Sequence, residues 1–249
     1  NQNQTEVWFT INSTAEYCSE WGAPCCKQGF SPCVIGSTLL TSRDSISGRS
    51  EPNQPNTIDT CSDGTSGTYQ SDESIDEVNI TDLDAQVFGC GHTVKVITKA
   101  YCWGTSDYIH FVYTNDSSSP SWQLLNYQAC PGSGFYTFEY TFSLDQKHGN
   151  HSIRVINAYN NYGFTCGTGS YDDNDDVVFF VDCLAPNITL ISPENNSVIR
   201  QGTIIDFEIE DPGNHLVKVI YSINGSSNQT LQYPYDIETN GWSEGSVYI

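Results

Sequence analysis

The sequence predicts an all-β protein with a disulfide-rich N-terminal region, and three observations support that prediction. Short runs of β-branched and aromatic residues recur along the chain, and several alternate apolar and polar residues with a period of two, as in residues 93–99 (TVKVITK). Gly, Asn, Asp and Ser separate these runs, and no helical periodicity extends over ten or more residues. The ten cysteines form an even set, which suits five disulfides and an oxidising, extracellular location.

Residues 1–17 form a polar lead-in that contains one candidate strand, residues 5–12 (TEVWFTIN). Side chains alternate between the two faces of a strand, so Val7, Phe9 and Ile11 make one apolar face and Trp8 points the other way. This face either packs on the cysteine-rich region of the same chain or joins a sheet in another copy. The opening NQNQTEV, which lacks methionine, is expected to be a processed terminus.

Residues 18–60 are rich in cysteine and poor in apolar residues, so disulfides rather than a hydrophobic core are expected to hold this region. A metal site is the weaker alternative, because no CxxC pair recurs and no histidine stands at a ligand-like distance from the cluster. The sequence does not fix which cysteines pair. The ten expected half-cystines are Cys18, Cys25, Cys26, Cys33, Cys61, Cys90, Cys102, Cys130, Cys166 and Cys183.

Residues 61–183 carry seven strand-like runs at the spacing of a β-sandwich: IDEVNIT, HTVKVITKAYCW, DYIHFVYTN, WQLLNYQA, FYTFEYTFSL, HSIRVINAYN and DDVVFFVDC. Seven or eight strands with long returns are typical of a jelly roll. The residues that follow, Leu184, Ala185 and Pro186, indicate a hinge before a further domain.

Residues 184–249 follow the strand pattern of an Ig-like sandwich. The expected strands are residues 186–193 (PNITLISP), 203–210 (TIIDFEIE), 216–223 (LVKVIYSI), 229–233 and the beginning of a fifth at 245–249. A sandwich of this type has about seven strands, so this one is expected to be incomplete within the chain. The alternative is that the sequence simply stops early. An open edge here and a spare strand at residues 5–12 predict strand donation between copies, and a head-to-tail contact that does not close makes a filament.

Thirty acidic and nine basic residues give a net charge of −21, which makes nucleic acid and anionic membranes poor partners and cations better ones. No stretch approaches the roughly 20 apolar residues of a membrane span. Two acidic runs predict a calcium site if the fold brings them together, because calcium takes many carboxylate and amide oxygens. The predicted ligands are Asp72, Glu73, Asp76, Asp172, Asp173, Asn174, Asp175 and Asp176.

The second acidic run is not an EF-hand. Asp172, Asn174 and Asp176 have the right one-three-five spacing, but Val177 stands where that loop requires glycine and Cys183 where it requires glutamate. Magnesium fits such loops less well, because it demands octahedral geometry. The alternative to a metal site is a solvated acidic turn whose carboxylates cap backbone N–H groups.

Nine Asn-X-Ser/Thr sequons predict an exterior that carries N-linked glycans. The alternative is that these residue types are simply common in β-loops. The nine acceptors are Asn3, Asn12, Asn79, Asn115, Asn150, Asn187, Asn195, Asn224 and Asn228.

The sequence predicts no enzyme. Its histidines form no HExxH motif, no serine lies in a GxSxG elbow, and no phosphate-binding loop is present. His110 is expected to be packed or at an edge, and His148 and His151 to flank an exposed turn. Aromatic residues such as Trp103 and Trp122 are expected in the core more than on a sugar-binding surface.

Five segments, EPNQPNTI (51–58), DGTSGTYQSDESID (63–76), YCWGTSDY (101–108), PSWQLL (120–125) and GSYDDNDDVVF (169–179), resemble a jelly-roll domain of secreted bacterial and archaeal exoproteins. The resemblance implies a non-catalytic accessory module. Two further segments, PNITLISPENNSVI and IEDPGNHLVKVIYSINGSS, are similar to Ig-like repeats of microbial surface proteins. The arrangement as a whole resembles glycosylated extracellular fibril subunits of environmental microbes.

These observations predict a secreted, glycosylated subunit of a cell-surface filament that binds copies of itself, with calcium making the jelly roll or the junction rigid. The alternative is an accessory module of a longer secreted protein that binds carbohydrate or a cell surface.

Overall fold

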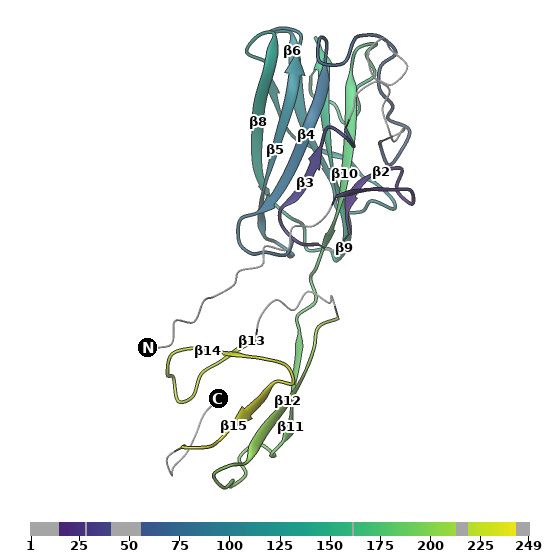
Figure 1. Ribbon diagram of the computed structural model, residues 1–249. Helices are drawn as coiled ribbons and strands as arrows, with labels where there is room; N and C mark the ends of the chain where they lie inside the picture. Colours follow the sequence, from purple (N-terminus) through teal and green to yellow (C-terminus); the bar gives the residue numbers. More distant parts are fainter. Residues whose placement is uncertain (1–14, 28, 41–55, 161, 213–218, 243–249) are drawn as a thin grey trace. The chain divides into compact units, whose positions relative to one another are not determined.

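The computed structural model describes residues 15–27, 29–40, 56–160, 162–212 and 219–242, and all its regular elements in those ranges are β-strands (Figure 1). The prediction of an all-β, disulfide-rich fold is confirmed. The chain divides into two compact units, Asn1–Cys183 and Leu184–Ile249, which we call the N-terminal and C-terminal units. The candidate donor strand with Val7, Trp8, Phe9 and Ile11 lies outside the described residues, and so does the expected strand at 245–249.

The N-terminal unit is built from two sheets. The four-stranded sheet is antiparallel and has the order β3 (Cys33–Gly36), β4 (Ser74–Asp82), β5 (Thr93–Cys102) and β8 (Gly134–Ser143). The six-stranded sheet has the order β1 (Glu16–Cys18), β2 (Ala23–Cys26), β10 (Asp173–Val181), β9 (Gly149–Tyr159), β6 (Asp107–Thr114) and β7 (Gln123–Ala129). Its neighbours are antiparallel except β2 and β10, which run parallel.

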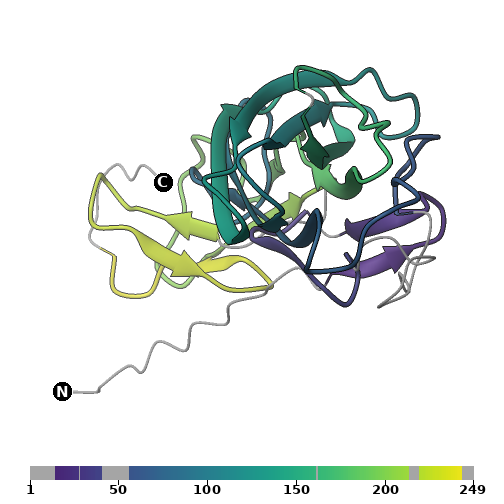
Figure 2. The same ribbon diagram turned by 90° about the horizontal axis from the view of Figure 1, so that it is seen from above.

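The core of this unit lies between the two sheets, and Figure 2 shows the strands arranged around it. Odd-numbered residues of the six-stranded sheet, such as Phe111, Val155 and Phe179, are fully buried there. They meet apolar residues of the four-stranded sheet such as Val78 and Val96. The alternation expected for half-buried strands therefore sets which side chains face the interior.

All ten cysteines are paired, as the even count predicted, and the pairs are Cys18–Cys25, Cys26–Cys33, Cys61–Cys166, Cys90–Cys183 and Cys102–Cys130. The cysteine-rich region is not held by disulfides alone. Its strands join both sheets, and Ile35 and Leu40 are buried in the main core. Cys26–Cys33 covalently links β2 of one sheet to β3 of the other.

The C-terminal unit contains five described strands in two small sheets. One sheet has the order β11 (Asn187–Ser192), β12 (Ile204–Glu210) and β15 (Asp236–Glu238), and the other pairs β13 (Val219–Tyr221) with β14 (Gln229–Leu231). Its core centres on Ile205, Leu231 and Ile237. The sequence patterns had indicated four of these strands but not β15.

Within the described parts of the chain, no helix has the length and apolar character needed to cross a membrane.

Candidate functional site

The two acidic runs meet across the interior of the N-terminal unit. The first run opens β4 and the second opens β10, and these strands belong to opposite sheets rather than lying side by side in one sheet. The backbone N–H of Ile75 donates a hydrogen bond to Asp173 Oδ2 at 2.6 Å. Both strands therefore begin at the same end of the sandwich, an arrangement that the sequence had left open.

Four buried polar side chains gather at this end, and we call them the acidic core: Glu73, Asp107, Asn157 and Asp173. Their exposed fractions are 0–1%. Asn157 lies opposite Asp173 in the β9–β10 register, and its Nδ2 donates to the backbone oxygen of Tyr101 on the facing sheet at 2.8 Å. Asp107 opens β6, in phase with interior residues of that strand, and accepts a hydrogen bond from Gly104 N at 2.9 Å. Three carboxyl groups and one amide thus share a water-excluded site.

Burial and like charge make ionisation of this group unfavourable. Burial raises the pKa of Glu73 to about 9, and a hydrogen bond with Asp72 and the charges of Asp72 and Asp107 contribute to the rise. Burial also raises the pKa of Asp107, although hydrogen bonds from Gly104 and Trp103 oppose this. The protonated form of Glu73 is therefore favoured at neutral pH.

Protein donors hold several other predicted calcium ligands. The carboxylate of Asp76 accepts hydrogen bonds from Tyr69 Oη at 2.8 Å and Ser74 Oγ at 3.0 Å. Asp72 is half-buried, and its Oδ1 accepts from Glu73 N at 3.2 Å. The bond to Asp72 comes from a backbone N–H, as the capping alternative describes, whereas Asp76 is held by side-chain hydroxyl groups.

In the second run, Asp172 accepts hydrogen bonds from Gly169 N at 2.8 Å and Tyr159 N at 3.3 Å. Asn174 accepts from Gly167 N at 2.8 Å, and Asp175 accepts from the Asn56 amide. Residues Asp172–Asp176 are all essentially inaccessible to solvent. The run is therefore part of the packed fold rather than an open loop.

Asp176 forms a buried ion pair that sequence analysis missed. Arg154 Nε and one terminal nitrogen donate to the two oxygens of Asp176 at 2.7 and 2.9 Å, and both side chains are at most 1% exposed. The same terminal nitrogen donates to Asp59 at 2.7 Å, and the guanidinium lies 4.1 Å from the ring centre of Trp122. Trp122 Nε1 in turn donates to Asp59 at 2.7 Å. Asp176 is thus neutralised by a protein cation, which leaves it a poor calcium ligand.

In the described ranges, three metal-ligand atoms approach within 4.8 Å of one another only at Glu16, Cys18 and Cys25. Both sulfur atoms there belong to one disulfide, so this trio is not a metal site. The eight predicted calcium ligands do not form one compact shell.

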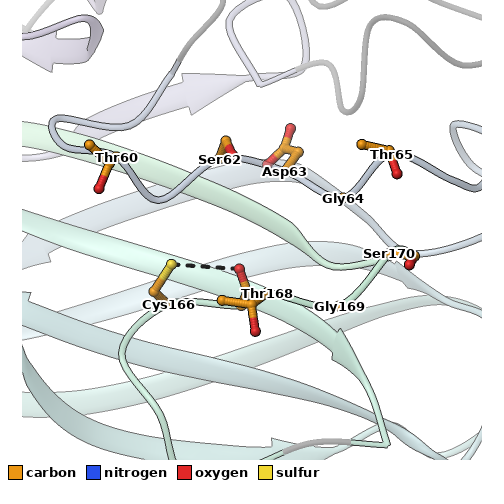
Figure 3. Close-up of a pocket in the computed structure, with 10 residues that line it drawn as sticks. Thr60, Ser62, Asp63, Gly64, Thr65, Cys166, Thr168, Gly169 and Ser170 are labelled. Carbon is orange, nitrogen blue, oxygen red and sulfur yellow. Dashed lines mark hydrogen bonds between the residues drawn. The ribbon is translucent and has the colours of Figure 1, made fainter.

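A shallow pocket of about 260 Å³ lies beside the Cys61–Cys166 disulfide (Figure 3). Hydroxyl side chains line it from two segments, and its residues are Thr60, Ser62, Asp63, Gly64, Thr65, Cys166, Gly167, Thr168, Gly169 and Ser170. Gly64 is required where the segments touch, because a Cβ there would lie 2.3 Å from the backbone oxygen of Ser170. Gly64 N also donates to Asp172 O at 2.8 Å, so the pocket wall covers the edge of β10 at its start.

Several aromatic residues expected in the core are exposed instead. Trp103 is 55% exposed and packs edge-on against Tyr159 with ring centres 5.9 Å apart. Tyr127 and Tyr162 are exposed and stack at 5.5 Å on the outer face of the six-stranded sheet. Trp122, by contrast, is half-buried on Arg154. These exposed aromatic residues lie at turns and on β7. The residues next to them in the sequence did not indicate that their side chains would be exposed.

Of the histidines considered in the sequence, His110 lies in the expected environment and His151 does not. His110 is packed as expected: it is fully buried and stacks on Phe164 at 4.4 Å, and burial lowers its pKa to about 4. His151 is not in an exposed turn. It is fully buried in β9, where Nε2 donates to Lys147 O and Nδ1 bonds to Tyr113 Oη, both at 2.7 Å.

The sequons differ in exposure between the two units. Asn187, Asn195, Asn224 and Asn228 of the C-terminal unit are exposed. Asn79, Asn115 and Asn150 of the N-terminal unit are half-buried, and Asn150 lies in β9 beside the buried His151 and Ser152. Asn3 and Asn12 lie outside the described residues. Glycosylation stays a prediction, and the C-terminal unit offers the more accessible acceptors.

No protein-family model matches the chain, and no curated protein matches it in sequence. The resemblances noted in the sequence therefore stay predictions.

Proposed function

We propose that the protein is the structural subunit of an extracellular, glycosylated filament in which one copy donates a β-strand to the C-terminal unit of the next. The observation that carries this proposal is β11. This strand is exposed along its whole length, with Ile188 62%, Leu190 36% and Ile191 51% exposed. A strand of that composition is expected to be covered in the working assembly.

The position of β11 in its sheet supports the same conclusion. Among the described strands it pairs only with β12, so its other edge offers backbone N–H and C=O groups to a partner. Among the described residues of this unit, the buried apolar residues of the core are Ile205, Leu231 and Ile237. An added strand would give both backbone hydrogen bonds and apolar cover.

The donor we propose is residues 5–12, and its identification rests on sequence. Val7, Phe9 and Ile11 make one apolar face, as a strand that covers a sheet edge requires. Donation from one end of a chain to the other end of the next is heterologous, so it need not close and produces a filament. The five disulfides fit an oxidising exterior, and the proposal assigns the chain no catalytic residue.

Electron microscopy of the purified protein tests the donor. Filaments are expected from the intact chain and not from a chain that lacks residues 1–14. Phe9→Asp should abolish them as well, because it places a charge on the apolar face. Thr10→Asp makes a similar charge change on the opposite face and should leave filaments intact.

A second pair of variants tests the acceptor. Ile188→Asp places a charge on β11 and should abolish filaments. Val198→Asp is the matched control, because Val198 is 101% exposed and lies outside every strand. A monodisperse intact protein, or filaments that survive both Phe9→Asp and Ile188→Asp, would overturn the proposal.

The exposed aromatic residues favour a second candidate, a module that binds carbohydrate or a cell surface. Trp103 with Tyr159 and Tyr127 with Tyr162 present ring faces of the kind that stack on sugars. Under this alternative, Trp103→Ala removes binding to a polysaccharide array while the fold is kept. Trp122→Ala is not an equivalent test, because Trp122 supports the Arg154 ion pair.

A further inference from the structure

Two tyrosine rings lie face to face on the outer surface of the six-stranded sheet. Tyr127 belongs to β7, and Tyr162 lies in the segment that connects β9 to β10. Their ring centres are 5.5 Å apart and their planes are inclined by only 25°. Tyr127 is 43% exposed and Tyr162 is 60% exposed. The two phenol rings are therefore in contact with each other and accessible from solvent.

Contacts with β6 hold the segment that carries Tyr162 against the sheet. His110 of β6 is fully buried, and Phe164 stacks on its ring with ring centres 4.4 Å apart. The backbone N–H of Gly163 donates a hydrogen bond to His110 Nε2 at 3.3 Å. The His110 ring also lies 5.8 Å from the ring of Tyr127. The two tyrosine rings are thus positioned by the same buried side chain, so their contact is part of the fold.

The composition of the chain directs oxidation toward such rings. Thiols and thioethers are the side chains that oxidants ordinarily attack first. The sequence contains no methionine, and all ten cysteines are paired in disulfides. Phenol and indole rings give up an electron most readily after these sulfur groups, and the chain has 15 tyrosines and 5 tryptophans. A one-electron oxidant is therefore expected to react with exposed aromatic rings.

We propose that Tyr127 and Tyr162 form a site of oxidative modification, at which a peroxidase-type oxidant joins the two rings as dityrosine. Each phenol loses one electron and one proton and becomes a phenoxyl radical with spin density on its ortho carbons. A carbon–carbon bond forms between one ortho carbon of each ring, and the hydrogen on each of these carbons returns to a phenol oxygen. One hydrogen peroxide molecule takes up the two electrons and two protons and becomes two waters. The proposal is independent of the proposed filament.

The ring geometry favours this pair over the other tyrosine contacts in the described ranges. Nearly parallel faces bring the ortho carbons of one ring over those of the other. The half-buried Tyr108 is inclined by 47° to Tyr162 and by 67° to Tyr127. In the C-terminal unit, Tyr233 and Tyr235 have ring centres 5.7 Å apart, but their planes are almost perpendicular, at 87°. Coupling is therefore expected first between Tyr127 and Tyr162.

The cross-link would tie an edge strand to a surface segment. Among the described strands, β7 ends the six-stranded sheet and pairs only with β6. A covalent bond from β7 to the β9–β10 connection restricts the unfolded chain as a disulfide does. Reductants do not break a carbon–carbon bond. The unfolding midpoint of the N-terminal unit should therefore rise on oxidation, and the increase caused by the cross-link should persist in reductant.

Peptide mapping of the full chain tests the proposal. The protein is treated with a haem peroxidase and hydrogen peroxide, recovered from the monomer band of a denaturing gel, reduced and digested with trypsin. Tyr127 and Tyr162 then fall in the separate peptides 100–147 and 155–200. These peptides should appear joined, with a mass lower than their sum by two hydrogen atoms, and fragment ions should place the bond at the two tyrosines. Dityrosine fluorescence should appear in the same band.

Phenylalanine variants test the two positions separately. Tyr127→Phe and Tyr162→Phe keep the stacked ring but lack the phenol oxygen, so each should lose the joined peptides. Tyr233→Phe is the matched control, because Tyr233 is 84% exposed in the other unit, and it should keep them. Absence of the joined peptides from the wild type, or a bond at another tyrosine that survives Tyr127→Phe, would overturn the proposal. The map of the wild type decides the question even if a variant does not fold.

Discussion

The two units of this chain achieve stability by opposite means. The N-terminal unit contains all ten cysteines, a continuous core between two sheets and buried polar groups such as Arg154. The C-terminal unit has no cysteine, and its described residues include three buried apolar residues at the centre of the core and a fully exposed strand, β11. A small domain without cross-links depends on burial, and the described strands of the C-terminal unit bury little. We therefore expect the N-terminal unit to resist unfolding more strongly than the C-terminal unit.

Removal of the Cys61–Cys166 disulfide should cause the largest loss of stability in the N-terminal unit. Cys61→Ala/Cys166→Ala opens a loop of 105 residues and is expected to lower the unfolding free energy of the N-terminal unit by about 4–5 kcal/mol. Cys18→Ala/Cys25→Ala opens a loop of only 7 residues and should cost about half as much. Calorimetry with and without reductant checks both values. If reductant also shifts the unfolding transition of the C-terminal unit, the proposed difference between the two units is wrong.

The buried ion pair gives the next largest effect. Arg154→Met leaves Asp176 buried without its counter-charge and should destabilise the N-terminal unit by about 3–5 kcal/mol in urea titrations. The double variant Arg154→Met/Asp176→Leu should recover much of that loss, because neither charge then remains buried. If the single and double variants are equally unstable, packing on Trp122 rather than the charge pair is the main contribution.

The pH dependence of stability should come partly from His110. Its folded pKa is about 4 against about 6.5 in the unfolded chain, so the unfolded state binds the proton more readily between those values. The stability from the neutral imidazole is therefore fully present above pH 6.5 and falls by roughly 3 kcal/mol as the pH drops to about 4. His110→Phe keeps a ring against Phe164 and should flatten the stability profile in that window. An unchanged slope in His110→Phe would assign the acid sensitivity to carboxyl groups instead.

Glycan acceptors should give the smallest effect on stability. Asn→Gln at the four exposed sequons of the C-terminal unit should change the unfolding free energy by no more than about 0.5 kcal/mol each. Intact-mass measurement of protein from the native source should show these four positions occupied more fully than Asn150, which lies in β9. Full occupancy of Asn150 would show that glycans are attached before β9 forms.

The sequence predicted the strands of the N-terminal unit better than it predicted their contacts. The period-two pattern at residues 93–99 falls within β5, and all seven strand-like runs match strands of the sandwich. Alternation is a local property, so it can be recognised without knowledge of the partner strand. The number of disulfides was equally accessible, because it follows from an even count of cysteines.

The acidic core could not be recognised from the sequence alone. Asp107 and Asn157 stand in ordinary strand patterns, and only the β6–β9–β10 order brings them to Asp173. Arg154 looked like any polar residue that alternates with apolar ones, and its partner Asp176 lies 22 residues away. Clusters of like charge can be recognised in one dimension, whereas their neutralising partners depend on strand order and register.

The disulfide pairing also determines how the chain would lengthen under tension. The covalent path from Cys61 to Cys183 crosses directly to Cys166 and then continues for 17 residues, so this stretch can extend to only roughly 60 Å when pulled from its ends. Without the cross-links its contour length would be roughly 430 Å. The 66 residues of the C-terminal unit contain no cross-link and can extend to roughly 230 Å. A string of such chains would therefore take up a stretching force by unravelling in its C-terminal units and recoil by refolding them.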